Sequence, residues 1–217
     1  GGPLDELRHY LPVGSEIEEL NRFAWFLKEK VLDGTEQMTP RPGTDVAIEN
    51  DRITQIGKIT PNKGDRVVDL TGKYLMPGLI NLHVHLPAGG KPQNKPMNTN
   101  RLTKIALSSG LSRALVLRMC HAYAMQGLLS GVTTVRAVGG LDNLDTRLRD
   151  RIHAGKLDGP RILAANYAIG VPHGHMVGSV TRPAETVEDA VRMVDQLHGQ
   201  NVDLIKLMIT GGVMDAK

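Results

Sequence analysis

The chain has 217 residues, of which 41% are apolar and 23% charged, a composition typical of a folded globular protein. The formal net charge of +3 is scattered rather than clustered, and no basic run alternates with aromatic residues, so nucleic-acid binding is not expected. No stretch reaches the ~18 consecutive apolar residues of a membrane span, and the single cysteine, Cys120, excludes an internal disulfide framework and predicts a reducing, cytoplasmic location.

The first 73 residues predict a helical extension followed by a small β module. Ser15 with Glu18 three residues later has the form of a capping box, which indicates a helix start. Short apolar runs separated by Pro- and Gly-rich turns then indicate strands. These strands are expected at residues 23–32, in a hairpin over 44–59, and at 67–70. We therefore expect a helical extension over residues 1–22 and a partial antiparallel β-sandwich module over residues 23–73.

From residue 74 the pattern changes to apolar strands that alternate with amphipathic helices, which indicates βαβ units and a parallel sheet. The strands are expected at 74–82, 132–135, 161–165 and 202–208, and the helices at 111–129, 141–154 and 185–198. Each unit takes roughly 35 to 40 residues, near the repeat of a (β/α)8 barrel. Residues 74–217 are therefore expected to form the first half, four βα units, of a TIM barrel in an α/β protein.

Two histidines stand where the first of these strands ends, in GLINLHVHLPAG, residues 78–89. Residues i and i+2 of a strand point to the same face, so His83 and His85 are expected to project together. Active sites of (β/α)8 barrels lie at the carboxyl ends of the strands, and two imidazoles placed there suit a divalent metal. The spacing alone is also found in incidental packing pairs, but the apolar strand before it favours a metal site.

The longer segment GKYLMPGLINLHVH, residues 72–85, resembles the signature of the amidohydrolase superfamily of metal-dependent hydrolases. In that superfamily the HxH motif after the first barrel strand binds a catalytic metal, and a small sandwich domain precedes the barrel in many members. The segment GVTTVRAVGG, residues 131–140, resembles the second strand of the same family. Asn81 and Ala137 depart from the family pattern, since Asp is the more usual residue at both positions.

A lysine lies within the fourth apolar strand, in VDLIKLMITGG, residues 202–212. A charge in an apolar strand is costly to bury unpaired, so the residue type alone favours a Lys206 that reaches solvent or pairs with a carboxylate. The resemblance implies a different role. In the two-metal branch of the superfamily, a Lys after the fourth strand reacts with carbon dioxide to give a carbamate that bridges both metals. This reaction needs the neutral amine, and desolvation lowers the pKa of a lysine in that direction.

Three further side chains are candidates for substrate binding. His173 and His175, in VPHGHMVG, follow the third strand and can bind substrate or orient a ligand, with flexible loop histidines as the equal alternative. Arg136 ends the second strand and can hold a substrate carboxylate through two hydrogen bonds. A structural ion pair is the alternative for Arg136.

The resemblance implies a binuclear amidohydrolase whose two divalent ions are held by His83, His85 and the carbamate of Lys206. Zinc is the default for such ligands, and manganese or cobalt also fits them. A metal-bridging hydroxide then attacks a small peptide-like or amide substrate and cleaves its C–N bond, as in prolidase-like and arginine-carboxypeptidase-like dipeptidases. The alternatives are a lactonase or phosphotriesterase, a mononuclear deaminase or cyclic-amide hydrolase, and a non-catalytic half-barrel assembly subunit.

The same resemblance predicts that these residues are only part of an active site. The family places two more His ligands after strands five and six and an Asp proton shuttle after strand eight. A complete barrel takes about 250 residues, and a half barrel exposes sheet edges and an apolar inner face. We therefore expect the isolated chain to be inactive, and a companion polypeptide or a missing C-terminal half to complete the barrel, which then forms a homo-oligomer.

Overall fold

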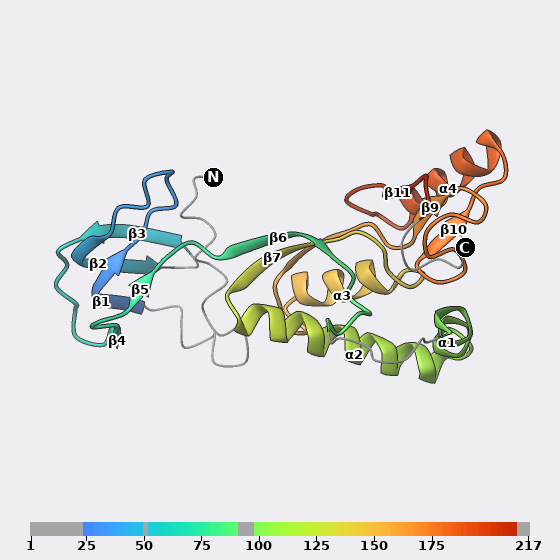
Figure 1. The fold of residues 1–217 in the computed structure, drawn as a ribbon. Coiled ribbons are helices and arrows are strands. Elements are labelled where there is room, and N and C mark those ends of the chain that lie inside the picture. The colour runs from blue at the N-terminus through green and yellow to red at the C-terminus, as the bar shows by residue number, and fades with distance from the viewer. Residues whose placement is uncertain (1–23, 50–51, 91–97, 212–217) are drawn as a thin grey trace. The chain divides into compact units, whose positions relative to one another are not determined.

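The computed structural model describes residues 24–49, 52–90 and 98–211, so the helix expected over residues 1–22 lies outside the described residues. The chain divides into two compact units between Leu79 and Ile80 (Figure 1). The sequence places the change of pattern slightly earlier, after residue 73. None of the described helices combines the length and the apolar character that crossing a bilayer requires.

The first unit contains one sheet of five strands (Figure 1). In chain order they are β1 (Ala24–Val31), β2 (Arg41–Glu49), β3 (Arg52–Gly57), β4 (Arg66–Asp69) and β5 (Tyr74–Leu75). β2 pairs antiparallel with both β1 and β3. A small apolar cluster of Val31, Val46, Ile48 and Leu75 forms the core of this unit.

The expectation of an all-antiparallel module is wrong for the last two strands, because β4 and β5 both pair with β1 in parallel. Within the described residues the module is also one sheet and not two packed sheets. Apolar alternation predicts that a strand exists, but only a tight hairpin connection, such as that between β2 and β3, also dictates the direction of pairing. The connection from β3 to β4 is longer and lets the chain return to the other edge of β1.

The second unit alternates strands with helices. Its strands are β6 (Leu79–Val84), β7 (Val132–Ala137), β8 (Arg161–Ala164), β9 (Ala168–Gly170), β10 (Thr181–Pro183) and β11 (Leu207–Met208). Its helices are α1 (Thr99–Ala106), α2 (Gly110–Leu129), α3 (Leu144–His153) and α4 (Val187–Gly199). One sheet has the order β6-β7-β8 and the other the order β10-β9-β11. β7 pairs in parallel with β8, and β9 pairs in parallel with both β10 and β11. The mixed α/β class is confirmed, whereas closure into half of a barrel stays a prediction.

Two of the predicted strands are shorter than expected. The run over residues 74–82 is divided between β5 and β6, because Pro77 has no amide hydrogen with which to continue a ladder. The run over residues 202–208 is a strand only at β11. Before β11, Asp203 and Ala164 exchange two hydrogen bonds, one from the Asp203 amide to the Ala164 carbonyl (2.8 Å) and one from the Ala164 amide to the Asp203 carboxylate (2.7 Å), so a side chain supplies half of this pairing.

The third predicted strand is bent, and the bend links the two sheets. β8 ends at Ala164 and β9 begins at Ala168, and between them Asn166 has a positive φ of 59°, a conformation that Asn tolerates better than most residues. Before the bend the chain pairs with β7, and after it the chain pairs with β11. The ladder therefore runs from β6 to β11 through a single bent strand.

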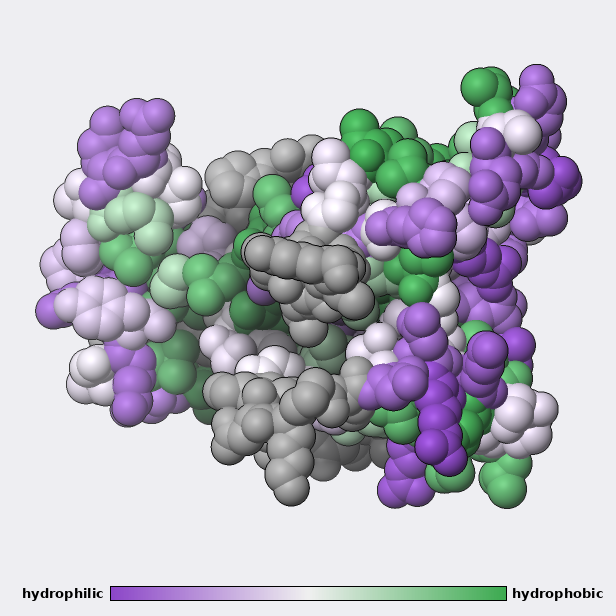
Figure 2. All heavy atoms as spheres, turned by 45° about the vertical axis from the view of Figure 1, so that its right-hand side comes forward, coloured by the Kyte–Doolittle hydropathy of each residue, from purple (hydrophilic) through white to green (hydrophobic). Residues whose placement is uncertain are grey.

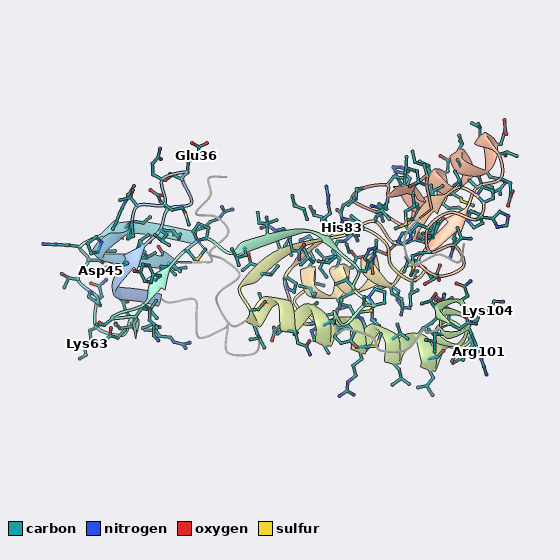
Figure 3. The ribbon with its side chains drawn as sticks, viewed as in Figure 1. Glu36, Asp45, Lys63, His83, Arg101 and Lys104 are labelled. Carbon is teal, nitrogen blue, oxygen red and sulfur yellow. The ribbon has the colours of Figure 1, made fainter. Side chains whose placement is uncertain are left out.

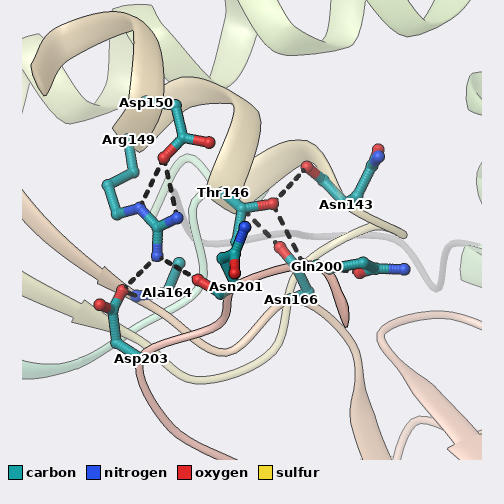
Figure 4. Close-up of polar contacts among 9 residues, drawn as sticks. All are labelled: Asn143, Thr146, Arg149, Asp150, Ala164, Asn166, Gln200, Asn201 and Asp203. Atoms are coloured by element: carbon teal, nitrogen blue, oxygen red, sulfur yellow. Dashed lines mark hydrogen bonds and ion pairs between the residues drawn. The ribbon is translucent and has the colours of Figure 1, made fainter. Parts of the chain in front are cut away.

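A buried polar network holds this bend (Figure 4). The side chain of Asn166 accepts from the amide of Thr146 (3.1 Å) and donates to the Thr146 hydroxyl (3.2 Å) and to Gln200 (2.8 Å). Beside it, Arg149 on α3 forms an ion pair with Asp203 (2.7 Å). Leaving a buried polar group without its partner costs about 1–3 kcal/mol. These bonds therefore fix α3 and the segment that leads into β11 against the end of β8.

The main core of the second unit lies between the β6-β7-β8 sheet and helices α2 and α3. Its buried side chains include Leu117, Cys120, Leu144, Leu148, Val135 and Ile162. Three apolar side chains of β6 lie outside this core, since Leu82 is 55% exposed and its neighbours Leu79 and Ile80 are exposed as well. β6 is also an edge strand, with β7 as its neighbour in the described residues. Apolar side chains also reach the surface elsewhere in the chain, as Figure 2 shows.

One carboxyl group lies inside this core. Asp145, in the first turn of α3, is 1% exposed, and neither of its oxygens has a hydrogen-bond partner among the described residues. Burial raises the pKa of Asp145 to about 7. The thiol of Cys120 has its pKa raised to about 12, first by burial and then by the charge of Asp145, so it stays neutral at physiological pH. Asp145 is therefore a buried acid with no compensating charge.

Replacing Asp145 by Asn is expected to stabilise the protein, relative to the wild type, more at pH 8 than at pH 5. As the pH rises above ~4 the unfolded state loses this proton first, so the stability of the wild type falls until the folded group ionises near pH 7. Asn cannot ionise, so the free energy of unfolding of Asp145→Asn relative to the wild type should increase by on the order of 2 kcal/mol from pH 5 to pH 8. Urea unfolding at both pH values measures this difference. Asp195→Asn on the exposed face of α4 is the control, and an equal pH dependence for the two variants would contradict the prediction.

Candidate metal centre

The two histidines of the HxH motif lie together at the end of β6. His83 belongs to the strand and His85 follows it directly (Figure 3 labels His83). Their ring centroids are 5.4 Å apart and the rings are inclined by 66°. The spacing of two residues predicts this common direction, and the structure brings the two imidazoles to one place.

The backbone of β6 is held by side chains as well as by its neighbouring strand. The side-chain oxygen of Asn81 accepts from the amide of His83 (3.1 Å), and Nε of Arg136 donates to the carbonyl of Leu82 (2.7 Å). Asn81 stands where the family more often has Asp, and its amide oxygen serves as the acceptor here. These bonds restrict the backbone on both sides of Leu82 and so limit the directions that the His83 side chain can take.

His85 is oriented by a carbonyl group from the next strand. Its Nδ1 lies 2.9 Å from the carbonyl oxygen of Gly139, just after β7. A carbonyl can only accept a hydrogen bond, so Nδ1 carries a hydrogen, and in the neutral ring Nε2 is then the nitrogen with the lone pair. A metal-binding histidine is commonly fixed by such a bond through its other ring nitrogen. The contact therefore leaves Nε2 as the ring nitrogen of His85 that would be available to a metal.

Gly139 makes this contact possible because it has no side chain. Its φ is +147°, which side chains rarely allow, and a Cβ there would lie 2.9 Å from Nδ1 of His85. The same Cβ would lie 3.5 Å from the side chain of Met208 on β11. Gly139 is not among the residues predicted from the sequence, although the pair Gly139-Gly140 after a strand is a signal of close backbone approach.

The electrostatic surroundings keep His83 neutral. Its side chain is exposed by surface area, yet partial desolvation by the surrounding protein is the largest of the effects that lower its pKa. The positive charges of Lys206, His85 and Arg136 lower the pKa of His83 further. A neutral imidazole is the form that binds a metal. Four of the six residues predicted from the sequence therefore lie within electrostatic reach of one another.

Lys206 immediately precedes β11, and its own carbonyl accepts from the amide of Ile169 on β9 (2.9 Å). Arg136 was expected to bind a substrate carboxylate or to form an ion pair. In the structure its Nε binds the backbone of β6 instead, a role that residue type cannot predict because any nearby carbonyl can accept.

The other histidine pair lies on the loop between β9 and β10. His173 is exposed with a positive φ of 59°, and the amide of His175 donates to the carbonyl of Thr210 (3.1 Å), just after β11. Across the residues that the structure describes, three or more His, Cys, Asp or Glu side chains do not gather into a group that can hold a metal. The two histidine pairs therefore do not form one set of ligands.

The comparison with protein families identifies the chain. Residues 74–217 match the model of the amidohydrolase family. The chain belongs to the amidohydrolase family. Members of this family are hydrolases that generally depend on bound metal, and the match begins just before the strand that carries the HxH motif.

Solved amidohydrolase structures share the fold. The crystal structure of a putative prolidase from Bifidobacterium longum is 28% identical, with a TM-score of 0.70 over 90% of this chain and 43% of that one. An amidohydrolase crystal structure is 25% identical, with a TM-score of 0.74 over 90% of this chain and 48% of that one. The chain thus spans less than half the length of these structures.

Shorter segments resemble curated enzymes. A 5-methylthioadenosine/S-adenosylhomocysteine deaminase of Thermoanaerobacter pseudethanolicus is 47% identical over 57 residues, which is 26% of this chain and 13% of that protein. A dihydroorotase of Pediococcus pentosaceus is 44% identical over 48 residues, 22% of this chain and 11% of that protein. These similarities are too short to choose one substrate.

Replacing Gly139 by Ala is expected to lower the affinity of the protein for zinc at least tenfold, because the new methyl group displaces the His85 ring and breaks its bond to the carbonyl. A competition titration with a chromophoric chelator measures this affinity. Gly127→Ala in α2, where a Cβ meets nothing within 4 Å, is the matched control and should bind zinc as the wild type does. Equal zinc affinity for Gly139→Ala and wild type would show that the contact does not orient a ligand.

Proposed function

We propose that this chain supplies the first half of the active site of a metal-dependent hydrolase that cleaves an amide or peptide C–N bond. The observation that carries the proposal is the histidine pair at the end of β6, in which Nδ1 of His85 is bound by Gly139 and the pKa of His83 is lowered. The lowered pKa of His83 favours the neutral imidazole that ligation requires. The family match supports the same reaction class.

The donor set fits divalent metal ions, although it is incomplete. His83 and His85 would hold one ion, and Lys206 as a carbamate would be shared between two, with zinc as the ion that suits imidazole ligands in hydrolases. When bound, such ions supply an activated water and stabilise negative charge on the substrate carbonyl oxygen. The residues of this chain hold the ligands in place, with Gly139 orienting His85 and Arg136 holding the backbone of β6.

Electrostatics support the carbamate on Lys206. Among the described residues, the charges that shift the pKa of His83 are all positive, and Lys206 has the largest effect among them. Adding metal cations to such a face is unfavourable unless a negative group joins them. The Lys206 ammonium first loses one proton to give the neutral amine, and reaction of this amine with carbon dioxide then forms an N–C bond, opens one C=O π bond and releases a second proton to solvent. Together the two steps convert one positive charge into one negative charge.

A small peptide-like substrate is favoured by the structural relative described as a prolidase, which covers 90% of this chain at 28% identity. The second candidate is a mononuclear deaminase or cyclic-amide hydrolase. It is favoured by the local similarity to a deaminase and to a dihydroorotase, each above 40% identity over about a quarter of the chain. The two candidates differ in the number of metal ions and in the need for Lys206.

Exposed apolar side chains support the completion of the barrel by a further half. Leu82 and its neighbours are exposed on β6, and Leu207 and Ile209 are exposed in and after β11, with Ile209 at 69%. β6 and β11 each have one neighbouring strand among the described residues. We propose that these two edges pair with the remaining strands, supplied by a companion polypeptide or by further residues of the same protein, which also supply the missing ligands.

Replacing Lys206 by Ala should reduce the bound metal from about two ions to one or fewer per completed barrel, because the shared ligand is lost, and activity on N-acyl amino acids and dipeptides should fall at least a thousandfold. Metal analysis and a hydrolysis assay measure the two effects. Lys156→Ala, at an exposed position beyond α3, is the control. Unchanged metal content with activity on a cyclic amide or an aminopurine would favour the mononuclear candidate instead.

Produced alone, the 217-residue chain is expected to self-associate and to bind fewer than two metal ions, because its apolar edges are uncovered. Leu82→Lys should reduce this association, as measured by light scattering, and should also prevent pairing with a co-expressed second half. Leu129→Lys, at the exposed end of α2, is the matched control. A monodisperse isolated chain that binds two ions and hydrolyses substrate would contradict the need for completion.

A further inference from the structure

The two glycines that follow β7 are enclosed by different side chains. The ring of His85 lies against the α-carbon of Gly139, where a Cβ would meet Nδ1 and Cε1. The carboxyl group of Asp145 lies against the α-carbon of Gly140, where a Cβ would overlap all three of its atoms. The imidazole of His85 therefore packs against Gly139, and the carboxyl group of Asp145 packs against the next residue, Gly140.

The amides on both sides of Gly139 are anchored. Val138 donates to the carbonyl of Val84 on β6 (3.0 Å), and Gly140 donates to the carbonyl of Asn166 at the bend between β8 and β9 (2.7 Å). The direction of the Gly139 carbonyl depends on the peptide plane between Gly139 and Gly140. That plane is set by the anchored amide of Gly140 and by Asp145, which packs against the α-carbon of Gly140.

The presence of an acid at position 145 is not explained by stability. Asp145 is buried without a hydrogen-bond partner among the described residues, in surroundings where an apolar side chain would cost less. A short planar group does, however, fit flat against a glycine, and the amino end of α3 favours an oxygen-bearing side chain in its first turn. Asn has the same shape and no charge, whereas Ala would leave the space beside Gly140 empty.

We propose that Asp145 is a positioning residue for His85. Its carboxyl group packs against Gly140 and fixes the carbonyl of Gly139, which holds Nδ1–H of His85 and leaves Nε2 directed to the metal. Asp145 touches neither the metal nor the substrate in this role. The inference rests on the proposed function only in taking His85 as a metal ligand.

The test uses protein labelled with 15N-histidine, in which the ring signals of His85 are identified by their loss in His85→Gln. The wild type should show one tautomer with a protected Nδ1–H. In Asp145→Ala this hydrogen should exchange at least tenfold faster, and zinc affinity should fall about tenfold. Asp145→Asn, which keeps the planar shape, should stay within twofold of the wild type in both measurements.

Two further variants separate positioning from general loosening. Leu148→Ala removes a fully buried side chain one turn along the same helix and should lower the melting temperature without changing the exchange of the His85 hydrogen. Gly140→Ala should collide with the carboxyl group of Asp145 and speed the exchange. In the double variant Gly140→Ala/Asp145→Ala the methyl group enters the vacated space, and protection should recover. This double variant also tests the proposal if Asp145→Ala alone does not fold.

Unchanged protection in Asp145→Ala, equal losses in Asp145→Asn and Asp145→Ala, an equal loss in Leu148→Ala, or no recovery in the double variant would each overturn the inference. The proposed function fails separately, if the completed wild-type protein binds no metal. In that case the hydrogen-exchange results would still decide whether Asp145 positions the His85 ring.

Discussion

The hydrogen bond between Nδ1 of His85 and the carbonyl of Gly139 is the contact on which the candidate metal centre depends. It joins the ends of β6 and β7, and it decides which nitrogen of the imidazole keeps its lone pair. The bond exists only because position 139 has a positive φ and no side chain. A glycine in a turn therefore determines the chemistry of a histidine more than fifty residues earlier in the chain.

The position of Lys206 depends on a second set of contacts, at the bend between β8 and β9. Asn166 holds the bend through Thr146 and Gln200, and Asp203 joins the segment before β11 to both α3 and the end of β8. These bonds are made largely in the protein interior, where an unpaired polar group is costly. The polar network thus holds the segment that leads to Lys206.

The candidate site combines positive charge with an incomplete ligand set. Lys206, His85 and Arg136 all lower the pKa of His83, which keeps it neutral but makes the face unfavourable for cations. The proposed carbamate on Lys206 would resolve this conflict, and the exposed apolar residues along β6 and β11 are where we propose that further strands attach. Both features agree with a chain that spans less than half the length of its structural relatives.

The sequence by itself determined the α/β class, the approximate limits of α2, α3, α4 and most strands, and the choice of His83, His85 and Lys206 as candidates. Periodicity reports which residues are apolar on one face, and the HxH spacing fixes a common direction, so neither needs a distant contact. The pairing of β4 and β5 with β1, the bend at Asn166, the backbone role of Arg136 and the burial of Asp145 were decided only by the tertiary structure. Each of these depends on a group that is remote in the sequence, and local patterns carry no information about which carbonyl, strand edge or glycine a side chain will meet.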